Sequence, residues 1–368
     1  MGAGAAAAMP ALGGSTWAAN WRTIQGGPNG PVRLDANENA YGPCAKSLAA
    51  LEDSAGMANR YPKGEYGDLT EAIAAKHAVS KERVVLGCGS SENLRMAVNA
   101  LLGPGKTMIY AEPTFEFMIE RARANGTQVV GVPLTKDYAH DVDAMLARAA
   151  GTAGGVVYIC NPNNPTGTLT SRRALETLIR QLPPTFSVVM DEAYHHFAVG
   201  ASPEYTSFLD QPVENERLIV TRTFSKIYGL AGVRIGYSVS STDVAKSLRA
   251  QAAQFAISLP AARAALAGWN DWETVRTGAA RNARDREEFY RQAKSRGLGL
   301  IDSYTNFVMV HSGRPVQEVI AHFRKNNVLI GRPFPPYLDY ARISLGTPSD
   351  MEQFWRVWDL MPAKKLPA

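Results

Sequence analysis

Short apolar runs alternate with amphipathic segments from about residue 68 to residue 239, and this alternation restricts the fold more than any other feature of the sequence. The runs are continuous and rich in β-branched residues, as are strands buried on both faces of a parallel sheet. They lie at 83–87, 107–110, 128–132, 156–160, 187–190, 218–221 and 233–239. Amphipathic segments between them, at 92–102, 116–125 and 172–181, are typical of covering helices. The pattern predicts an α/β fold with a mainly parallel seven-stranded sheet.

The length of 368 residues exceeds what one hydrophobic core usually serves, so we expect two domains. After about residue 270 the pattern changes to a long charged helix at 273–296, strand-like runs at 306–310, 328–330 and 342–345, and helix-like segments at 316–326 and from 349. This region is typical of a smaller α+β domain. We expect a large domain over 63–259, a small domain formed by 31–62 and 260–368, and a flexible N-terminal leader over 1–30.

Composition and charge disfavour several classes of protein. The net charge is only +5 and the basic residues are dispersed, which argues against a nucleic-acid partner. The three cysteines, Cys44, Cys88 and Cys160, are far apart and show no ligand spacing, so we expect neither a disulfide framework nor a bound metal. The first fifteen residues are small and uncharged and cannot span a bilayer, so we expect no membrane association. The expected location is the cytoplasm, and export to the periplasm by a removed signal is the minor alternative.

The segment 221–237, TRTFSKIYGLAGVRIGY, is the strongest local signal of chemistry because Lys226 stands among hydroxyl groups and glycines directly after a predicted strand. A lysine in a loop is usually a solvated charge. Here Thr223 and Ser225 offer hydroxyl groups, the glycines permit close approach of the backbone, and Arg234 suits a phosphate dianion. An imine-forming lysine must be partly desolvated, so that its neutral amine is accessible near neutral pH. We interpret Lys226 as a candidate Schiff-base lysine.

A second signal is an apolar strand that ends in Asp191 and leads to Tyr194. Ligands of open parallel sheets bind beyond the carboxyl ends of the strands. An aspartate at such a place often only caps the next turn. Facing a pyridine nitrogen, however, a carboxylate keeps that nitrogen protonated and lets the ring accept electrons. Tyr194 is then a candidate hydrogen-bond partner of the 3′ oxygen of the same ring.

Two further turns follow predicted strands. The sequence NPNNPTG at 161–167 is a rigid turn, and it also fixes the amide of Asn164 at one point, from which it can donate to a phenolate-like oxygen. Gly89, Ser90 and Ser91 lead from a strand into a helix, where unpaired backbone N–H groups and two hydroxyls form a ready anion site. The simpler interpretation of a Gly-Ser turn is a helix N-cap. Because the other motifs accompany it, we assign this turn to a cofactor phosphate.

Together the motifs NPNNPTG, DEAY, TFSK and the arginine eight residues beyond the lysine resemble those of the fold type I pyridoxal-phosphate (PLP) aminotransferases, in the same order. Asn164 precedes Asp191 by 27 positions, and Asp191 precedes Lys226 by 35. The segments LDANENAYGP at 34–43, NRYP at 59–62 and RISLGTPSD at 342–350 are similar to those of the histidinol-phosphate aminotransferase branch. The resemblance extends over about residues 30 to 360. It implies an aspartate-aminotransferase-like fold with PLP as the cofactor.

The resemblance also implies how residues would contact the cofactor ring. Lys226 would form the internal aldimine and move the proton between substrate and cofactor through a quinonoid intermediate. Asp191 would pair with the pyridinium, and Tyr194 and Asn164 would contact the ring oxygen. Phe115 stands where the family places an aromatic residue against the ring, although a core phenylalanine is equally consistent with its position.

The phosphate of the cofactor would be bound by groups from three segments of the chain. The residues implied at or beside it are Gly89, Ser90, Ser91, Thr223, Ser225 and Arg234. Tyr61 would reach the phosphate of the neighbouring subunit. The resemblance therefore implies a homodimer with shared active sites.

At the substrate end, Arg342 matches the arginine with which the family binds the substrate carboxylate, a group that a bidentate guanidinium fits. A surface ion pair is the alternative. Arg332 matches a second arginine that faces the substrate. Asn37 and Tyr41 match residues of the N-terminal motif that close over it.

Two segments depart from the histidinol-phosphate aminotransferase pattern. His195 and His196 follow DEAY, and the segment 332–340 is bulkier and richer in proline. Both should line or support the substrate end, so the substrate is left open. Each histidine is either a packed, hydrogen-bonded residue or an acid/base group that works on a different substrate.

Transamination is the function that the resemblance implies, with an amino acid or related amine as donor and a 2-oxo acid as acceptor. In an alternative, the same PLP machinery lets a carbanion react with dioxygen, which gives an oxidase or monooxygenase. The two histidines would suit the handling of peroxide-level intermediates. Motifs that only build the cofactor site do not separate these functions.

Overall fold

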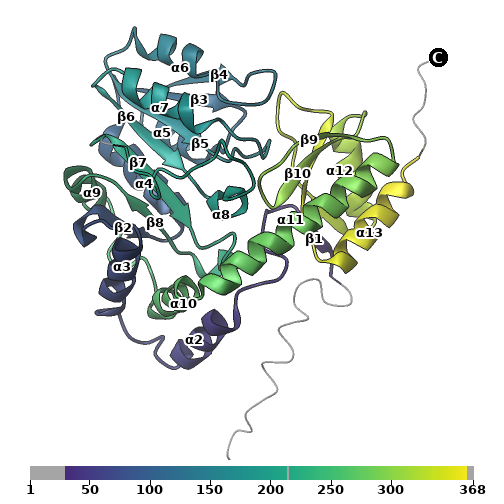
Figure 1. Cartoon of the computed structure of the whole chain (residues 1–368), viewed down its shortest axis with the longest axis horizontal. Coiled ribbons are helices and arrows are strands. Elements are labelled where there is room, and N and C mark those ends of the chain that lie inside the picture. The colour runs from purple at the N-terminus through teal and green to yellow at the C-terminus, as the bar shows by residue number, and fades with distance from the viewer. Residues whose placement is uncertain (1–29, 214, 363–368) are drawn as a thin grey trace, which may run out of the picture.

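The computed structural model describes residues 30–213 and 215–362, in a larger and a smaller part that lie side by side (Figure 1). The larger part holds a seven-stranded sheet, and the smaller part holds a three-stranded sheet. We expect a leader over 1–30, and its residues 1–29 lie outside the described part of the chain. Among the described residues, no helix combines the length and the apolar character needed to cross a bilayer.

The larger sheet has the strand order β2-β8-β7-β6-β5-β3-β4, in which β8 is antiparallel to both neighbours and every other pair is parallel. Its strands are β2 (Val84–Gly87), β3 (Thr107–Glu112), β4 (Gln128–Pro133), β5 (Gly155–Cys160), β6 (Phe186–Asp191), β7 (Leu218–Thr223) and β8 (Gly236–Val239). Each strand coincides with a predicted apolar run, so the mainly parallel seven-stranded sheet is confirmed.

Two layers of helices cover the two faces of this sheet (Figure 1). One core contains residues of α3 (Glu65–Lys76), α6 (Val142–Ala149), α7 (Arg172–Gln181) and α10 (Leu259–Trp269). The other contains residues of α4 (Ser90–Leu101), α5 (Phe117–Ala124) and α9 (Thr242–Arg249). In β5, Val157 and Ile159 join the first core, whereas Tyr158 and Cys160 join the second. Strand side chains alternate between faces, and because both faces are covered the strands appear as continuous apolar runs in the sequence.

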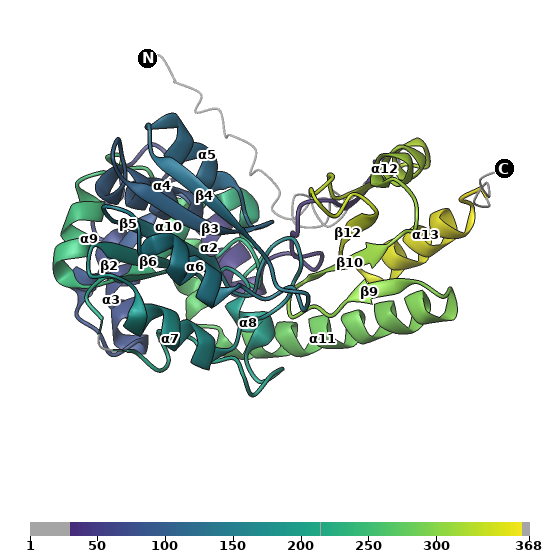
Figure 2. The same cartoon turned by 90° about the horizontal axis from the view of Figure 1, so that it is seen from above.

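The smaller part packs three helices against the antiparallel sheet β12-β10-β9. Its elements are α11 (Trp272–Ser295), β9 (Gly299–Ile301), β10 (Phe307–His311), α12 (Val316–Lys325), β12 (Tyr340–Ser344) and α13 (Pro348–Asp359). Strand β1 (Val32–Leu34) pairs in parallel with β11 (Val328–Ile330), so the start of the described chain completes this part. Figure 2 shows α11 running from the edge of the larger part along the smaller part. Its Val275 lies in the larger core and its Phe289 in the smaller core.

Helices α2 (Ala45–Ala55) and α10 lie with the larger part, although the boundaries that we expect, 31–62 and 260–368, assign both to the small domain. Ser47 Oγ donates to the carbonyl oxygen of Ala264 at 2.8 Å, and a Cβ on Gly268 would lie 2.6 Å from that Oγ. Small residues therefore let α2 approach α10, and Leu51 packs against the larger core. Apolar periodicity predicts that a helix is buried but not which of two cores receives it.

Candidate active site

A cavity of about 340 Å³ opens where β5, β6 and β7 end, between the larger and the smaller part. Most of the residues predicted for the site line it: Asn37, Ser90, Ser91, Phe115, Asn164, Asp191, Tyr194, Thr223, Ser225, Lys226, Arg234, Arg332 and Arg342. The fold thus brings together segments that are as far apart in sequence as residues 37 and 342. Their meeting at the carboxyl ends of parallel strands is the usual position of a ligand site in such sheets.

Lys226 lies in the turn that follows β7. Its Nζ donates to the backbone carbonyl oxygens of Asn37 at 3.1 Å and Ala36 at 3.4 Å. Desolvation, together with the nearby positive charge of Arg342, lowers the pKa of Lys226 to about 8. A neutral amine is therefore accessible near neutral pH, which imine chemistry and proton transfer both require.

Asp191 ends β6 and is buried. Its carboxylate accepts two hydrogen bonds, from the Tyr158 phenol to Oδ2 at 3.0 Å and from the backbone N–H of Ala193 to Oδ1 at 3.2 Å. Burial raises the pKa of Asp191 to about 6, and both donors oppose this rise. At neutral pH the carboxylate is largely ionised, as the partner of a protonated ring nitrogen must be.

Two amide side chains position other polar groups of the cavity. Asn37 Nδ2 donates to the Tyr194 hydroxyl oxygen at 3.0 Å, so the Tyr194 proton stays free to donate. Arg342 Nη1 donates to Asn164 Oδ1 at 2.7 Å. Because this bond occupies the amide oxygen, Asn164 faces the cavity with its Nδ2 as donor. Both arrangements suit an oxygen acceptor on a ligand.

Arg342 belongs to β12, and its guanidinium is buried at the small-domain side of the cavity. Nη2 donates to the backbone carbonyl oxygen of Asp35 at 2.8 Å, and the guanidinium stacks on the Phe334 ring at 4.6 Å. Burial lowers the pKa of Arg342 to about 10, so it is still charged at neutral pH. A buried, charged and oriented guanidinium suits a carboxylate or a phosphate.

Donor groups surround a small anion cradle at the N-terminus of α4. Gly89 precedes the helix with a φ of +74°, and a Cβ on it would lie 2.3 Å from Nη2 of Arg234. A Cβ on Gly236 would likewise lie 2.3 Å from the backbone nitrogen of Ser90. Arg234 Nη1 also donates to Ser225 Oγ at 3.3 Å. Backbone N–H groups, a hydroxyl and a guanidinium thus meet where only glycine leaves room, and this fits the phosphate group of a cofactor such as PLP.

Two tyrosines predicted for the site lie outside this cavity. Tyr61 is 70% exposed, and its ring centroid lies 4.7 Å from that of Phe255. Tyr41 lines a second cavity of about 240 Å³, where its hydroxyl donates to Asp285 Oδ2 at 3.0 Å and Arg281 stacks on its ring at 4.3 Å. These contacts hold Tyr41 against α11. From the sequence we expect Tyr41 to close over the substrate, but in the structure it lies outside the Lys226 cavity.

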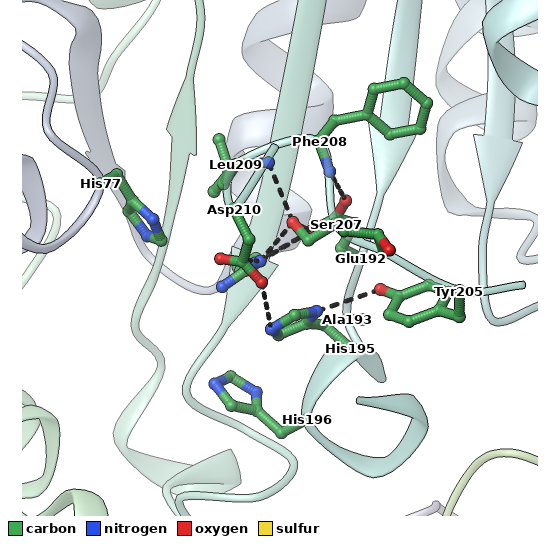
Figure 3. Close-up of polar contacts among 12 residues, drawn as sticks. His77, Glu192, Ala193, His195, His196, Tyr205, Ser207, Phe208, Leu209 and Asp210 are labelled. Carbon is green, nitrogen blue, oxygen red and sulfur yellow. Dashed lines mark hydrogen bonds and ion pairs between the residues drawn. The ribbon is translucent and has the colours of Figure 1, made fainter. Parts of the chain in front are cut away.

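His195 and His196 lie in the short helix α8 (His195–Ala198), within a buried polar network (Figure 3). His195 Nδ1 lies 3.1 Å from the Tyr205 hydroxyl, and its Nε2 lies 3.6 Å from Asp210 Oδ2. Burial lowers the pKa of both histidines well below the ordinary value, so both are neutral near pH 7. Neither lines the Lys226 cavity, and the expected substrate contact is therefore corrected: both are packed residues.

Glu192, which Figure 3 labels, forms the charged centre of the same network together with Arg222. Arg222 Nη2 lies 2.9 Å from Glu192 Oε2, and Ser207 Oγ donates to the same oxygen at 2.6 Å. Both charged side chains are buried. The network joins β6, β7 and the 199–213 loop directly behind Asp191, so it fixes the strand end from which that carboxylate projects.

Sequence patterns do not single out Tyr158 and Glu116, which the structure adds to the site. Tyr158 shares a sheet face with Asp191 because Asp191 is the register partner of Cys160 in β5. A hydroxyl group in an otherwise apolar strand is the available signal for it. Glu116 forms an ion pair with Arg332, and no local pattern indicates such a contact across the two parts.

Comparisons with known proteins agree with this geometry. A family model described as "Aminotransferase class I and II" matches residues 29–357. A histidinol-phosphate aminotransferase of Moorella thermoacetica is 34% identical over 327 residues, 88% of this chain and 84% of that protein. One of Methylobacillus flagellatus is 35% identical over 329 residues, 89% and 87% of the two chains. The crystal structure of histidinol-phosphate aminotransferase from Sinorhizobium meliloti in complex with pyridoxal-5'-phosphate matches with a TM-score of 0.84 at 26% identity, over 93% of this chain and 94% of that chain.

Proposed function

The chain belongs to the class I and II aminotransferases and is a PLP-dependent transferase, and from this we propose that it moves an amino group from an amino acid or a related amine to a 2-oxo acid. One observation carries the proposal: Lys226, Asp191 and Arg342 line a single cavity together with the anion cradle at Arg234. When bound, PLP supplies an aldehyde that takes up the amino group and a ring that accepts the electrons released at the donor α-carbon.

Lys226 is the residue that would carry the proton. Its amine, with a pKa lowered to about 8, can accept the proton of the donor α-carbon and return it to the other end of the transfer. The carbonyl oxygens of Ala36 and Asn37 accept from Nζ and hold it in the cavity. A lysine so placed acts as acid and as base in the same turnover.

The remaining polar groups would bind and orient the cofactor. Asp191 would hold a proton at the ring nitrogen, while Tyr194 and the Nδ2 of Asn164 would donate to the ring oxygen. Phe115 would lie against the ring. The phosphate would be bound by the cradle residues Ser90, Ser91, Ser225 and Arg234, with Gly89 leaving room for it and Thr223 supporting the turn through its bond from the Ser225 N–H at 3.0 Å.

Arg342 would bind the carboxylate next to the amino group of the donor. It is charged at neutral pH, buried, and already oriented by Asn164 and by the carbonyl of Asp35. Histidinol phosphate, which the names of the relatives specify, is a related amine within this proposal. Its phosphate is an anion that a guanidinium can also bind.

A homodimer and a cytoplasmic location are further parts of the proposal. Tyr61 and Phe255 form an exposed aromatic pair, and Tyr61 would reach the phosphate cradle of the neighbouring subunit. The cysteines Cys44, Cys88 and Cys160 are free, as is usual in a reducing compartment, and the periplasm is the minor alternative. Sedimentation of the PLP-loaded protein should give a mass of two chains, and a monomer at working concentrations would contradict the shared site.

The test of the function is a panel of amino donors, histidinol phosphate included, assayed with and without 2-oxoglutarate while oxygen uptake is recorded. We expect turnover that requires the oxo acid and consumes no oxygen. Oxygen-dependent turnover without an acceptor would instead support the oxidase or monooxygenase alternative. The oxidase or monooxygenase alternative depended on His195 and His196, which do not line the cavity. The relatives above also carry aminotransferase names.

A further inference from the structure

An ion pair joins the two parts of the molecule beside the Lys226 cavity. Arg332, from the segment between β11 and β12, meets Glu116, which immediately precedes α5. Arg332 lines the cavity, and the side chains of Arg332 and Glu116 are 53% and 44% exposed. The pair therefore lies where the cavity meets solvent, with one partner from each part of the fold.

The two arginines of the cavity differ in how their charges are balanced. Arg342 donates to the neutral amide of Asn164 and to a backbone carbonyl, and no described carboxylate lies within ion-pair distance of it. Arg332 is paired with the Glu116 carboxylate and also donates to a backbone carbonyl at 3.0 Å. Both guanidinium groups stack on the same ring, that of Phe334, at 4.6 Å and 4.3 Å. The cavity thus offers one cation that needs an anionic ligand and one that already has an anionic partner.

We propose that Glu116 is an exchangeable counter-ion that determines which substrates Arg332 accepts, an inference that rests on the proposed aminotransferase function. A ligand with a single carboxylate binds Arg342 and leaves the Glu116–Arg332 pair intact. A ligand with a second anionic group reaches Arg332 only by displacing Glu116. The enzyme therefore favours amino donors with uncharged side chains over donors with a carboxylate or phosphate at the far end.

The exposure of the pair sets the size of the effect. Ion pairs with this degree of exposure are weak, so displacement of Glu116 costs a dianionic ligand about twofold to fivefold in affinity. A 2-oxo acid with two carboxylates can still bind, because the displacement of Glu116 from Arg332 reduces its affinity only slightly. Glu116 therefore adjusts the preference between ligand charges without excluding either class.

The experiment measures binding to the PLP-loaded protein by calorimetry, with glutarate as a dicarboxylate probe and 3-phenylpropionate as a monocarboxylate probe. Glu116→Gln keeps the shape of the side chain and removes its charge. We expect this variant to bind glutarate about twofold to fivefold more tightly and 3-phenylpropionate unchanged. Glu120→Gln is the matched control, because Glu120 is an exposed carboxylate one turn along α5 and forms none of the ion pairs of the described residues.

A double-mutant cycle isolates the contact itself. In a background of Arg332→Gln, the Glu116→Gln change should no longer alter glutarate binding, because the counter-ion has nothing left to neutralise. Equal effects of Glu116→Gln and Glu120→Gln on glutarate, or equal changes for both probes, overturn the proposal. Failure of the proposed aminotransferase function would give a different result. No pair of amino donor and oxo acid would then react, yet Glu116→Gln would still change the ratio of the two probe affinities. If neither probe binds the unaltered protein, both proposals fall.

Discussion

Removal of the Tyr158 hydroxyl tests the electrostatics of the site most directly. Tyr158 is fully buried, and its phenol donates to Asp191 Oδ2 at 3.0 Å. Tyr158→Phe keeps the ring in the core between the sheet and α4 and deletes only the donor. The N–H of Ala193 remains on the other carboxylate oxygen, Oδ1. The substitution therefore changes the charge equilibrium of Asp191 with little change in packing.

The magnitude follows from the strength of a hydrogen bond to a charged group, about 1.5 to 3 kcal/mol, and from the 1.36 kcal/mol that corresponds to one unit of pKa. Burial already raises the pKa of Asp191 to about 6, and loss of the donor raises the pKa further. A protonated Asp191 does not stabilise a protonated ring nitrogen. The acid limb of the pH–rate profile should therefore move upward by about 1 to 2 pH units, so activity is lost at neutral pH and regained at higher pH.

The assay is kcat/KM as a function of pH, with a parallel absorbance titration of the bound cofactor. Tyr110→Phe is the matched control, because Tyr110 is the register partner of Tyr158 on β3 and is also buried. Its hydroxyl accepts from Arg123 at 3.3 Å instead of contacting Asp191. An acid limb that stays in place in Tyr158→Phe, or that moves equally in Tyr110→Phe, would show that the Tyr158 hydroxyl does not control the pKa of Asp191.

Three other substitutions test the cofactor site and its support. Lys226→Ala should abolish the visible absorbance band of the bound cofactor, and an unchanged spectrum would contradict its assignment. Gly89→Ala places a methyl group 2.3 Å from a guanidinium nitrogen of the cradle and should weaken PLP binding by about tenfold in a fluorescence titration. Gly105→Ala, at a φ of +80° with open space around it, should not. Glu192→Gln removes the nearer anionic partner of buried Arg222 and should lower the free energy of unfolding by about 3 kcal/mol in urea; a loss below about 1 kcal/mol would contradict a structural role for the pair.

The sheet and the centre of the site could be predicted from the sequence because both depend on short-range patterns. A strand buried on both faces is a continuous apolar run, and in a parallel sheet the residue that follows such a run lies at the ligand-binding edge. Asp191 and Asn164 each follow such a run, and the structure brings both to the same cavity. For Asp191 and Asn164, the position after an apolar run is therefore sufficient to predict that they lie at the site.

Contacts between distant segments and the direction of side chains could not be predicted in the same way. Glu116 and Arg332 are 216 positions apart, and only the packing of two separate cores brings them together. His195 and His196 follow Tyr194 directly, yet each helical residue turns the side chain by about 100°. Helix α8 therefore directs His195 toward Tyr205 and Asp210, and His196 toward Tyr228, instead of into the cavity. Residues adjacent in sequence therefore point into different sites, whereas the distant residues Glu116 and Arg332 are in contact.

Helix α11 is a rigid connection between the larger and the smaller part, because it contributes side chains to both cores. Its 24 residues extend about 36 Å at 1.5 Å per residue, from a first turn anchored in the larger core at Val275 to its last two turns, anchored in the smaller core at Phe289 and Ala293. Because an α-helix is stiff along its axis, a tilt of about 5° at one end carries the other end about 3 Å. That displacement is the length of one hydrogen bond, so a modest rotation is enough to break or to form the contacts at the rim of the cavity. The contacts at the rim of the cavity therefore depend on the angle between the two parts of the fold to within a few degrees.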